Sequence, residues 1–139
     1  MKKVFLDTNI LLDFLDNQRL QHNAAKELVY FLLRHEIKIV FSEDMISTIV
    51  YLVRKNAPAQ RALVQVFEQI TYDSNIIICN FGEMVIRNAC NYFLRNNGDF
   101  EDILQYFCAE KEGCCAIYSS DMGFPKLKIP VKRYGEYDI

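Results

Sequence analysis

Short apolar runs alternate with longer amphipathic stretches along the whole chain. The continuous runs have the β-branched and aromatic composition of strands buried on both faces. They cover residues 4–6, 37–41, 76–79, 114–118 and, in a shorter form, 130–134. Between them, apolar residues recur at helical spacing, which predicts helices after residue 7 and over residues 22–35, 42–53, 58–72, 82–95 and 99–113. Strands that alternate with helices predict a three-layer α/β/α fold with a central parallel sheet of four to five strands.

Polar residues mark where several of these helices begin and end. Thr8 or Asn9 is the candidate N-cap of the first helix, Ser42 of the helix after the second strand, and Asp99 of the last helix. The Asn-Asn-Gly sequence at residues 96–98 ends the helix before Asp99. These boundaries place several polar side chains at the ends of strands.

Length and composition indicate one domain that covers residues 1–139. The chain has 139 residues, of which 51% are apolar, so it is long enough to bury a core. The formal net charge of −2 and the isoelectric point near 5.7 give no overall attraction for polyanions. Binding of a nucleic acid would therefore depend on a local basic patch.

The cysteines and the apolar runs bear on cellular location. The five cysteines form no C-x-x-C pair and have no histidines at zinc-site spacing, which is typical of reduced, mostly buried thiols. No apolar run approaches the length of a membrane span, and the N-terminus does not resemble a signal peptide. We therefore expect a soluble cytoplasmic protein without a membrane partner.

Three separate segments each bring a carboxylate to the end of a predicted element. Asp7 follows the first strand, Asp121 follows the fourth, and Asp99 and Asp102 open the last helix. In a parallel α/β sheet the ligand crevice lies outside the carboxyl ends of the strands. Carboxylates gathered there favour a hard divalent cation with oxygen ligands. The pattern is that of a metal site.

The order and spacing of these motifs resemble the PIN domain family over nearly the whole chain. The residues that carry the resemblance are Phe-Leu-Asp-Thr-Asn at 5–9, Asp-Phe-Glu-Asp at 99–102 and Ser-Ser-Asp at 119–121. The Asp-Phe-Glu-Asp sequence is similar to that of one branch of the family. Each motif alone is weak, but the three together, in this order at opposite ends of one α/β domain, are specific.

The resemblance implies a function and a set of site residues. PIN domains are metal-dependent nucleases, and many small ones are VapC-type toxins of toxin-antitoxin pairs that cut RNA. It implies Mg²⁺ or Mn²⁺ as cofactor, RNA as substrate, an antitoxin as partner, and a homodimer. Asp7, Asp102 and Asp121 match the catalytic, metal-binding aspartates, and Asp99 matches a further acidic position of the branch.

Two smaller polar residues, Asn9 and Ser119, match the positions that support these carboxylates. The family's second acid, usually Glu, is replaced here by Thr48. Asp44 lies one helical turn earlier and is a possible substitute, although a carboxylate in the first turn also complements the helix dipole. Thr48 therefore leaves open a second function, a degenerate PIN fold that binds RNA or a protein without cutting. A flap-type DNA nuclease is disfavoured because the chain lacks large insertions.

Other polar residues have simpler interpretations. Asp13 and Asp16 follow the solvent face of the first helix, and Glu101 is expected to be solvated and to point away from Asp102. His22 and His35 are interpreted as non-catalytic.

Basic residues form two groups, one of which follows the last acidic motif. That group consists of Lys126, Lys128, Lys132 and Arg133. It either holds an RNA backbone near the metal or forms a solvated edge that protects the last strand from pairing.

Overall fold

The computed structural model describes residues 1–139 as five strands and six helices. The strands are β1 (Lys3–Leu6), β2 (Lys38–Ser42), β3 (Ile76–Cys79), β4 (Ala116–Tyr118) and β5 (Val131–Lys132). The helices are α1 (Thr8–Leu15), α2 (His22–Arg34), α3 (Asp44–Leu52), α4 (Ala57–Ile70), α5 (Gly82–Asn96) and α6 (Phe100–Lys111). The predicted alternation of strands and helices is confirmed, with boundaries that differ by a few residues.

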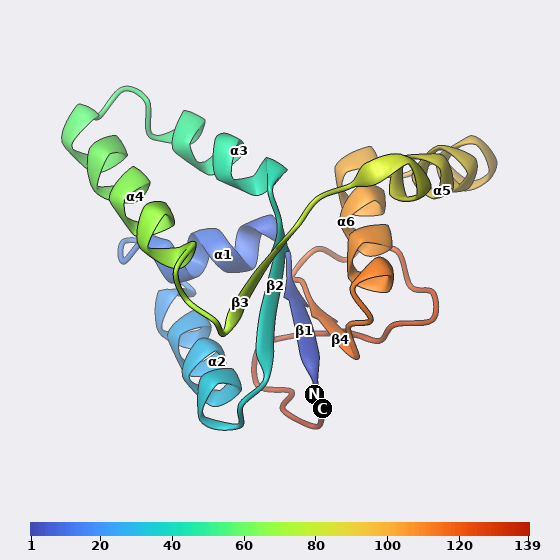
Figure 1. The fold of residues 1–139 in the computed structure, drawn as a ribbon, viewed down its shortest axis with the longest axis horizontal. Coiled ribbons are helices and arrows are strands. Elements are labelled where there is room, and N and C mark those ends of the chain that lie inside the picture. The colour runs from blue at the N-terminus through green and yellow to red at the C-terminus, as the bar shows by residue number, and fades with distance from the viewer.

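All five strands form one parallel sheet in the order β3-β2-β1-β4-β5. The central strand β1 pairs with β2 on one side and with β4 on the other, where Phe5 lies opposite Ile117. Figure 1 shows α1 and α2 on one side of the sheet and α6 on the other, with α3–α4 and α5 extending away in opposite directions. The three-layer prediction is therefore confirmed.

The two faces of β1 explain why its last three residues, Val4, Phe5 and Leu6, are all apolar. Val4 and Leu6 pack with the buried residues of α1 and α2, whereas Phe5 packs with those of α3 and α6. All three side chains are fully buried. Alternate side chains of a strand point to opposite faces, so a strand covered on both sides carries no polar position. The first polar residue after β1 is Asp7, at the edge of the sheet.

Two predicted caps are wrong, the first because Asp7 caps the helix instead and the second because the Ser42 side chain has another partner. Asp7, rather than Thr8 or Asn9, caps α1, and its Oδ1 accepts the Ile10 N–H at 2.9 Å. Ser42 is the last residue of β2, and its hydroxyl donates to the Asp44 carboxylate instead of capping α3. The predicted Asp99 cap of α6 is confirmed, with a 3.0 Å bond from the Asp102 N–H.

The cysteines are free, and three of the five are buried, namely Cys79, Cys108 and Cys114. None of the helices has the length and apolarity that crossing a membrane requires.

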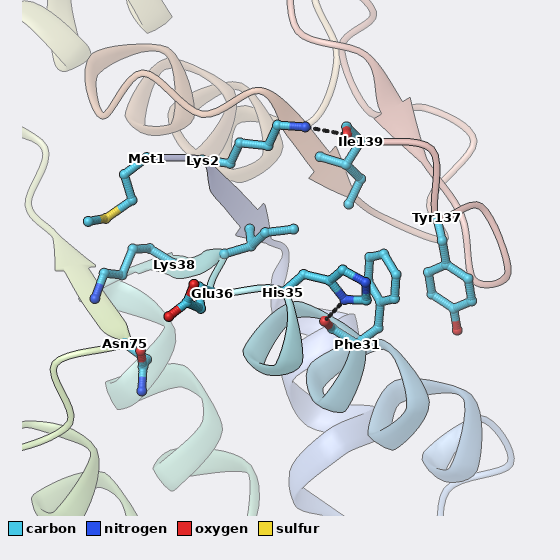
Figure 2. A pocket seen from close by; sticks show the side chains of 10 residues that line it. Met1, Lys2, Phe31, His35, Glu36, Lys38, Asn75, Tyr137 and Ile139 are labelled. Carbon is cyan, nitrogen blue, oxygen red and sulfur yellow. Dashed lines mark hydrogen bonds between the residues drawn. The ribbon is translucent and has the colours of Figure 1, made fainter.

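A hollow of about 850 Å³ lies at the end of the sheet opposite Asp7. There Lys2 bonds to the carbonyl of Ile139, and the ring of Phe31 stacks on Tyr137 (Figure 2). It holds none of the acidic residues that the sequence singles out.

Candidate active site

The residue at the centre of the site is Asp7, which is only 2% exposed although it is a carboxylate. It directly follows β1, and its backbone N–H donates to the carbonyl of Tyr118 in β4 at 3.1 Å. Burial raises the pKa of Asp7 above its ordinary value, and nearby charges, that of Asp121 first, raise it further. Hydrogen bonds from Ser119 and from the Ile10 N–H work in the opposite direction.

The loop after β4 brings Asp121 to the same edge of the sheet. Ser119 is fully buried, and its hydroxyl oxygen accepts the Asp121 N–H at 3.0 Å. Asp121 itself is exposed, and its Oδ1 accepts the Gly123 N–H at 2.8 Å. Ser119 therefore contacts both aspartates that flank the β1–β4 edge, which is the supporting position that the sequence predicts for it.

The N-terminal turn of α6 contributes Asp102 from the other side of the crevice. Asp102 is half-buried, and its Oδ2 is inaccessible to solvent and has no hydrogen-bond donor in the protein. Asp99, one turn earlier, is exposed and caps the helix. A buried acceptor without a partner is uncommon in native proteins and calls for a ligand or a proton.

Asp102 and Asp121 lie close enough to share a hydrogen bond. Burial, the hydrogen bond to Asp121 and the charges around it raise the pKa of Asp102 to about 8. The same hydrogen bond, together with the Gly123 N–H and the charge of Arg133, lowers the pKa of Asp121. Asp102 therefore retains its proton to a higher pH than a free carboxyl group, and Asp121 loses its proton more readily, a pattern typical of like charges held at one site.

A further carboxylate, Glu101, turns out to face the crevice. It is exposed, as the sequence predicts, and its Oε1 accepts hydrogen bonds from the Thr8 hydroxyl at 3.4 Å and from Gln105 Nε2 at 3.3 Å, so its carboxylate is not contacted by solvent alone. Burial raises the pKa of Glu101, and the charges of Asp44 and Asp99 raise it further. The helical spacing of Glu101 and Gln105 is visible in the sequence, whereas the contact with Thr8 is not.

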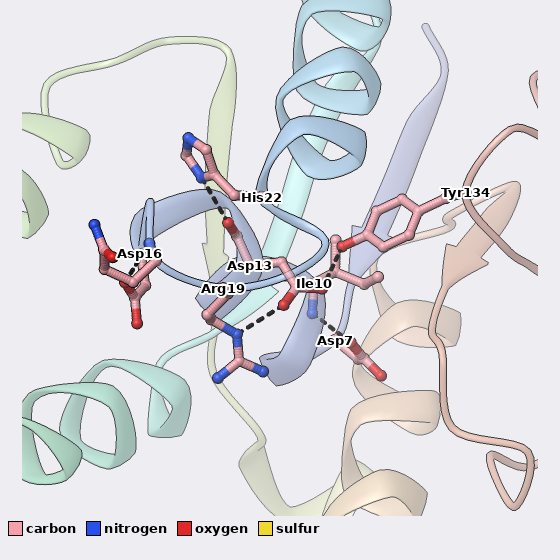
Figure 3. A network of polar contacts seen from close by, with 8 residues as sticks. Asp7, Ile10, Asp13, Asp16, Arg19, His22 and Tyr134 are labelled. Carbon is pink, nitrogen blue, oxygen red and sulfur yellow. Dashed lines mark hydrogen bonds and ion pairs between the residues drawn. The ribbon is translucent and has the colours of Figure 1, made fainter.

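The prediction for Asp13 is wrong. Its side chain is buried, at 6% exposure, where it binds Arg19 Nε at 2.7 Å and the Tyr134 hydroxyl at 2.7 Å (Figure 3). Asp13 lies three residues after the buried Ile10, so the two share one face of α1. The three-residue spacing from an apolar position could therefore have predicted the burial of Asp13. His22 is not near a carboxylate; its Nδ1 bonds to the Asp13 carbonyl.

The basic group after Asp121 is divided in the structure. Lys132 pairs with Asp138 at 3.1 Å, and the guanidinium of Arg133 contacts the carbonyl of Ser119 and the sulfur of Met122. Lys126 and Lys128 are exposed. Arg133 is therefore the member whose charge acts on the acidic site, through Asp121.

The oxygen-rich donor set fits a hard divalent cation such as Mg²⁺ or Mn²⁺. Asp102 Oδ2 has no hydrogen-bond partner, so it is free to bind a cation. The proton that Asp102 holds beside Asp121 neutralises negative charge that a bound cation would neutralise instead. No three His, Cys, Asp or Glu side chains form a ready-made metal centre, so binding requires loss of that proton and small side-chain movements. The ligand atoms therefore suit such a cation by their type, although they are not already arranged around one position.

The parallel sheet and the carboxylates at its β1–β4 edge define an α/β protein with an acidic, nuclease-like crevice. A model of the PIN domain matches residues 4–130. The chain belongs to the PIN domain family. It is similar to Ribonuclease VapC1 of Aquifex aeolicus (strain VF5), with 32% identity over 139 residues, 98% of this chain and 93% of that protein.

Solved structures share the fold at low sequence identity. The complex of VapBC2 from Rickettsia felis with a promoter DNA fragment has a TM-score of 0.70 at 14% identity, over 95% of this chain and 98% of that chain. VapC20 of Mycobacterium tuberculosis, a toxin that cleaves the sarcin-ricin loop, has a TM-score of 0.68 at 16% identity, over 87% and 92%. These likenesses confirm the predicted fold.

The raised pKa values predict that the metal-free protein loses stability as the solution becomes more alkaline. Asp102 binds its proton more tightly in the folded than in the unfolded chain, so stability falls from the unfolded pKa, 3.8, up to about 8. Asp7 and Glu101 act in the same direction. Thermal melts in EDTA between pH 5 and 9 should show this decline, and Asp102→Asn should make it shallower. If the melting temperature fell equally with pH in wild type and Asp102→Asn, the raised pKa of Asp102 would be contradicted.

Proposed function

We propose that this PIN-domain protein is a metal-dependent endoribonuclease and the toxin of a type II toxin-antitoxin pair. The observation that carries the proposal is the partnerless, buried Oδ2 of Asp102 beside Asp7 and Asp121. Similarity to a ribonuclease over nearly the whole chain supports it. The complexes of related toxins and antitoxins support the antitoxin partner.

In this proposal Asp7, Asp102 and Asp121 are the catalytic aspartates and, with Asp99, hold the cation. Bound Mg²⁺ or Mn²⁺ supplies an activated water and neutralises charge on the phosphate. The water oxygen would bond to phosphorus and give up a proton to solvent while the bond to the leaving ribose oxygen breaks, and the leaving oxygen would take up a proton from solvent. The Ile10 N–H holds one oxygen of Asp7, and the Ser119 hydroxyl oxygen holds the backbone of Asp121, so few adjustments would bring these carboxylates to the cation.

Substituting Asp7 or Asp102 tests the reaction and the metal together. Purified protein with Mn²⁺ should cut single-stranded or structured RNA, and EDTA should stop the cutting. Asp7→Asn and Asp102→Asn should both abolish cutting and the calorimetric heat of Mn²⁺ binding. Asn is as good an N-cap as Asp, so Asp7→Asn should still support α1.

The control is Asp16→Asn, an exposed carboxylate at the far end of α1, which should leave both readouts unchanged. We would abandon the nuclease if a broad RNA panel stayed intact with either metal. Equal cutting by wild type and Asp102→Asn would identify a contaminating enzyme.

Asp44 is proposed to supply part of the charge that the family's Glu would bring. Asp44 opens α3 and is half-buried, and its charge acts on Glu101 across the crevice. Thr48 follows one turn later on the same helix face and is also half-buried. A purely helix-dipole role for Asp44 does not require proximity to another carboxylate.

Two substitutions on α3 distinguish these roles. Asp44→Asn should weaken Mn²⁺ binding severalfold, and Thr48→Glu should strengthen it, because each changes the negative charge that faces the crevice. Glu43→Gln, an exposed neighbour, is the matched control. Unchanged Mn²⁺ affinity in Asp44→Asn, with a stability loss of ~0.3–1 kcal/mol, would leave only the dipole role.

The degenerate alternative is favoured by one observation, the replacement of the acid by Thr48. It predicts RNA binding without cutting and no Mn²⁺ heat in calorimetry. The proposed homodimer is tested by light scattering of the purified protein.

An apolar groove between α1 and the α3–α4 pair is the surface we propose for the antitoxin. It has a volume of about 730 Å³. Its apolar lining includes Leu12, Leu15, Ile49, Leu52, Leu63 and Val66. Grooves of this kind accept the apolar face of an amphipathic helix. Leu52 is 56% exposed, which leaves a large side chain available to a partner.

Leu52→Asp should therefore weaken binding of the protein encoded by the adjacent antitoxin gene by at least ~tenfold, the effect of burying an unpaired charge. Isothermal titration calorimetry measures this affinity, and a thermal melt checks that the variant is folded. Tyr72→Asp, another highly exposed apolar position outside the groove, is the control. Equal affinity for wild type and Leu52→Asp would exclude the groove.

A further inference from the structure

The buried carboxylate of Asp13 fixes an arginine beside the acidic site. Asp13 Oδ1 binds Arg19 Nε at 2.7 Å, and Asp13 Oδ2 accepts the Tyr134 hydroxyl at 2.7 Å. The carbonyl of Asp13 also bonds to His22 Nδ1 at 2.9 Å. These contacts join α1, the loop between α1 and α2, and the segment after β5 (Figure 3). The Arg19 side chain therefore has one partner, Asp13, which is itself held by Tyr134 and contacted by His22.

The Arg19 side chain uses only Nε in this network. Its Nη1 and Nη2 make no hydrogen bond within the protein, and the side chain keeps 36% exposure. In Figure 3 the two Nη atoms point away from Asp13 and Tyr134. A guanidinium whose Nε is occupied still has its outer donors in a fixed plane, which is the geometry that binds two oxygens of one phosphate.

Arg19 lines a hollow that lies next to the catalytic carboxylates. The hollow has a volume of about 380 Å³, and its remaining wall consists of Asn9, Asp13, Leu20, Gln21 and Ser120. Asn9 comes two residues after Asp7, and Ser120 directly precedes Asp121. The amide, hydroxyl and guanidinium donors thus gather at one opening, a few residues from the atoms that would hold the metal.

We propose that this hollow binds a backbone phosphate of the RNA next to the cleaved one, with Arg19 as the contacting group and Asp13 as its positioning residue. The inference rests on the proposed function. The Arg19 side chain loses little conformational entropy when it binds phosphate, because the bond to Asp13 already restricts it. The bond from Nε to Asp13 sets the plane of the guanidinium, and the positive charge and the outer donors are left for the phosphate. The sequence of the RNA plays no part in such a contact.

RNA binding measured in EDTA isolates this contact from cleavage. The probe is a short fluorescein-labelled single-stranded RNA, titrated at several salt concentrations and followed by anisotropy. Arg19→Gln should weaken binding by about tenfold and reduce the slope of log affinity against log salt by ~0.7, the value for one lost phosphate contact on a single strand. Arg19→Lys keeps the charge, so it should keep the slope and lose part of the affinity.

Two controls separate phosphate binding from a bracing role. Arg34→Gln removes an exposed arginine from the other end of α2 and should change neither affinity nor slope. Tyr134→Phe removes one bond to Asp13 and should lower the melting temperature while the salt slope stays that of wild type.

Several results would overturn the inference. Arg19→Gln with wild-type affinity and slope would show that Arg19 only braces the loop, and the proposed nuclease would stand if Mn²⁺-dependent cutting persisted. If Tyr134→Phe lowered the slope of log affinity against log salt as much as Arg19→Gln does, this would also indicate that Arg19 only supports the loop. Loss of antitoxin binding in Arg19→Gln with unchanged RNA binding would assign Arg19 to the protein partner. A wild-type protein that binds no RNA would remove this inference and the proposed function together.

Discussion

The burial of the Asp7 carboxylate at the end of β1 is the constraint on which the site depends. A charge out of water is costly unless hydrogen bonds and a favourable field compensate it. The Ile10 N–H, the N-terminal dipole of α1 and the Ser119 hydroxyl offset part of that cost, and the pKa of Asp7 stays raised because burial outweighs them. The start of α1 and the position of the loop after β4 are thus tied to one side chain. The apolar strand, the helix and the crevice form a single unit.

The fold also determines the electrostatics of the crevice, because it brings several carboxylates together. Asp102 comes from α6 and Asp121 from the loop after β4, so the fold forces together two groups that repel each other when both are charged. A proton shared between them relieves the repulsion, and a cation would relieve it more completely. Arg133 offsets part of the charge from outside. The site is therefore stable when metal-free, yet it retains a preference for positive charge.

The sequence was sufficient for the elements, the parallel sheet and the family, because these follow from local periodicity and from motifs at element ends. It also predicted the Asp99 cap, which needs only a residue and the turn that follows it. The burial of Asp13 was not predicted, and the contact of Glu101 with Thr8 was not foreseen, because the partners Tyr134 and Thr8 are distant in the chain. Contacts of this kind follow from the packing of elements, which no single stretch of sequence encodes.

The position of β4 has a consequence for the synthesis of the protein. β1 (Lys3–Leu6) pairs with β4 (Ala116–Tyr118), which follows it only after six helices and two other strands have been made, and β4 in turn brings Ser119 and Asp121 to Asp7. A chain still growing on the ribosome holds the first carboxylate but lacks the strand that completes the crevice. Long-range pairing of this kind forms late because the intervening chain must first be available. The acidic site of the proposed nuclease is therefore completed by one of the last pairings to form as the chain folds.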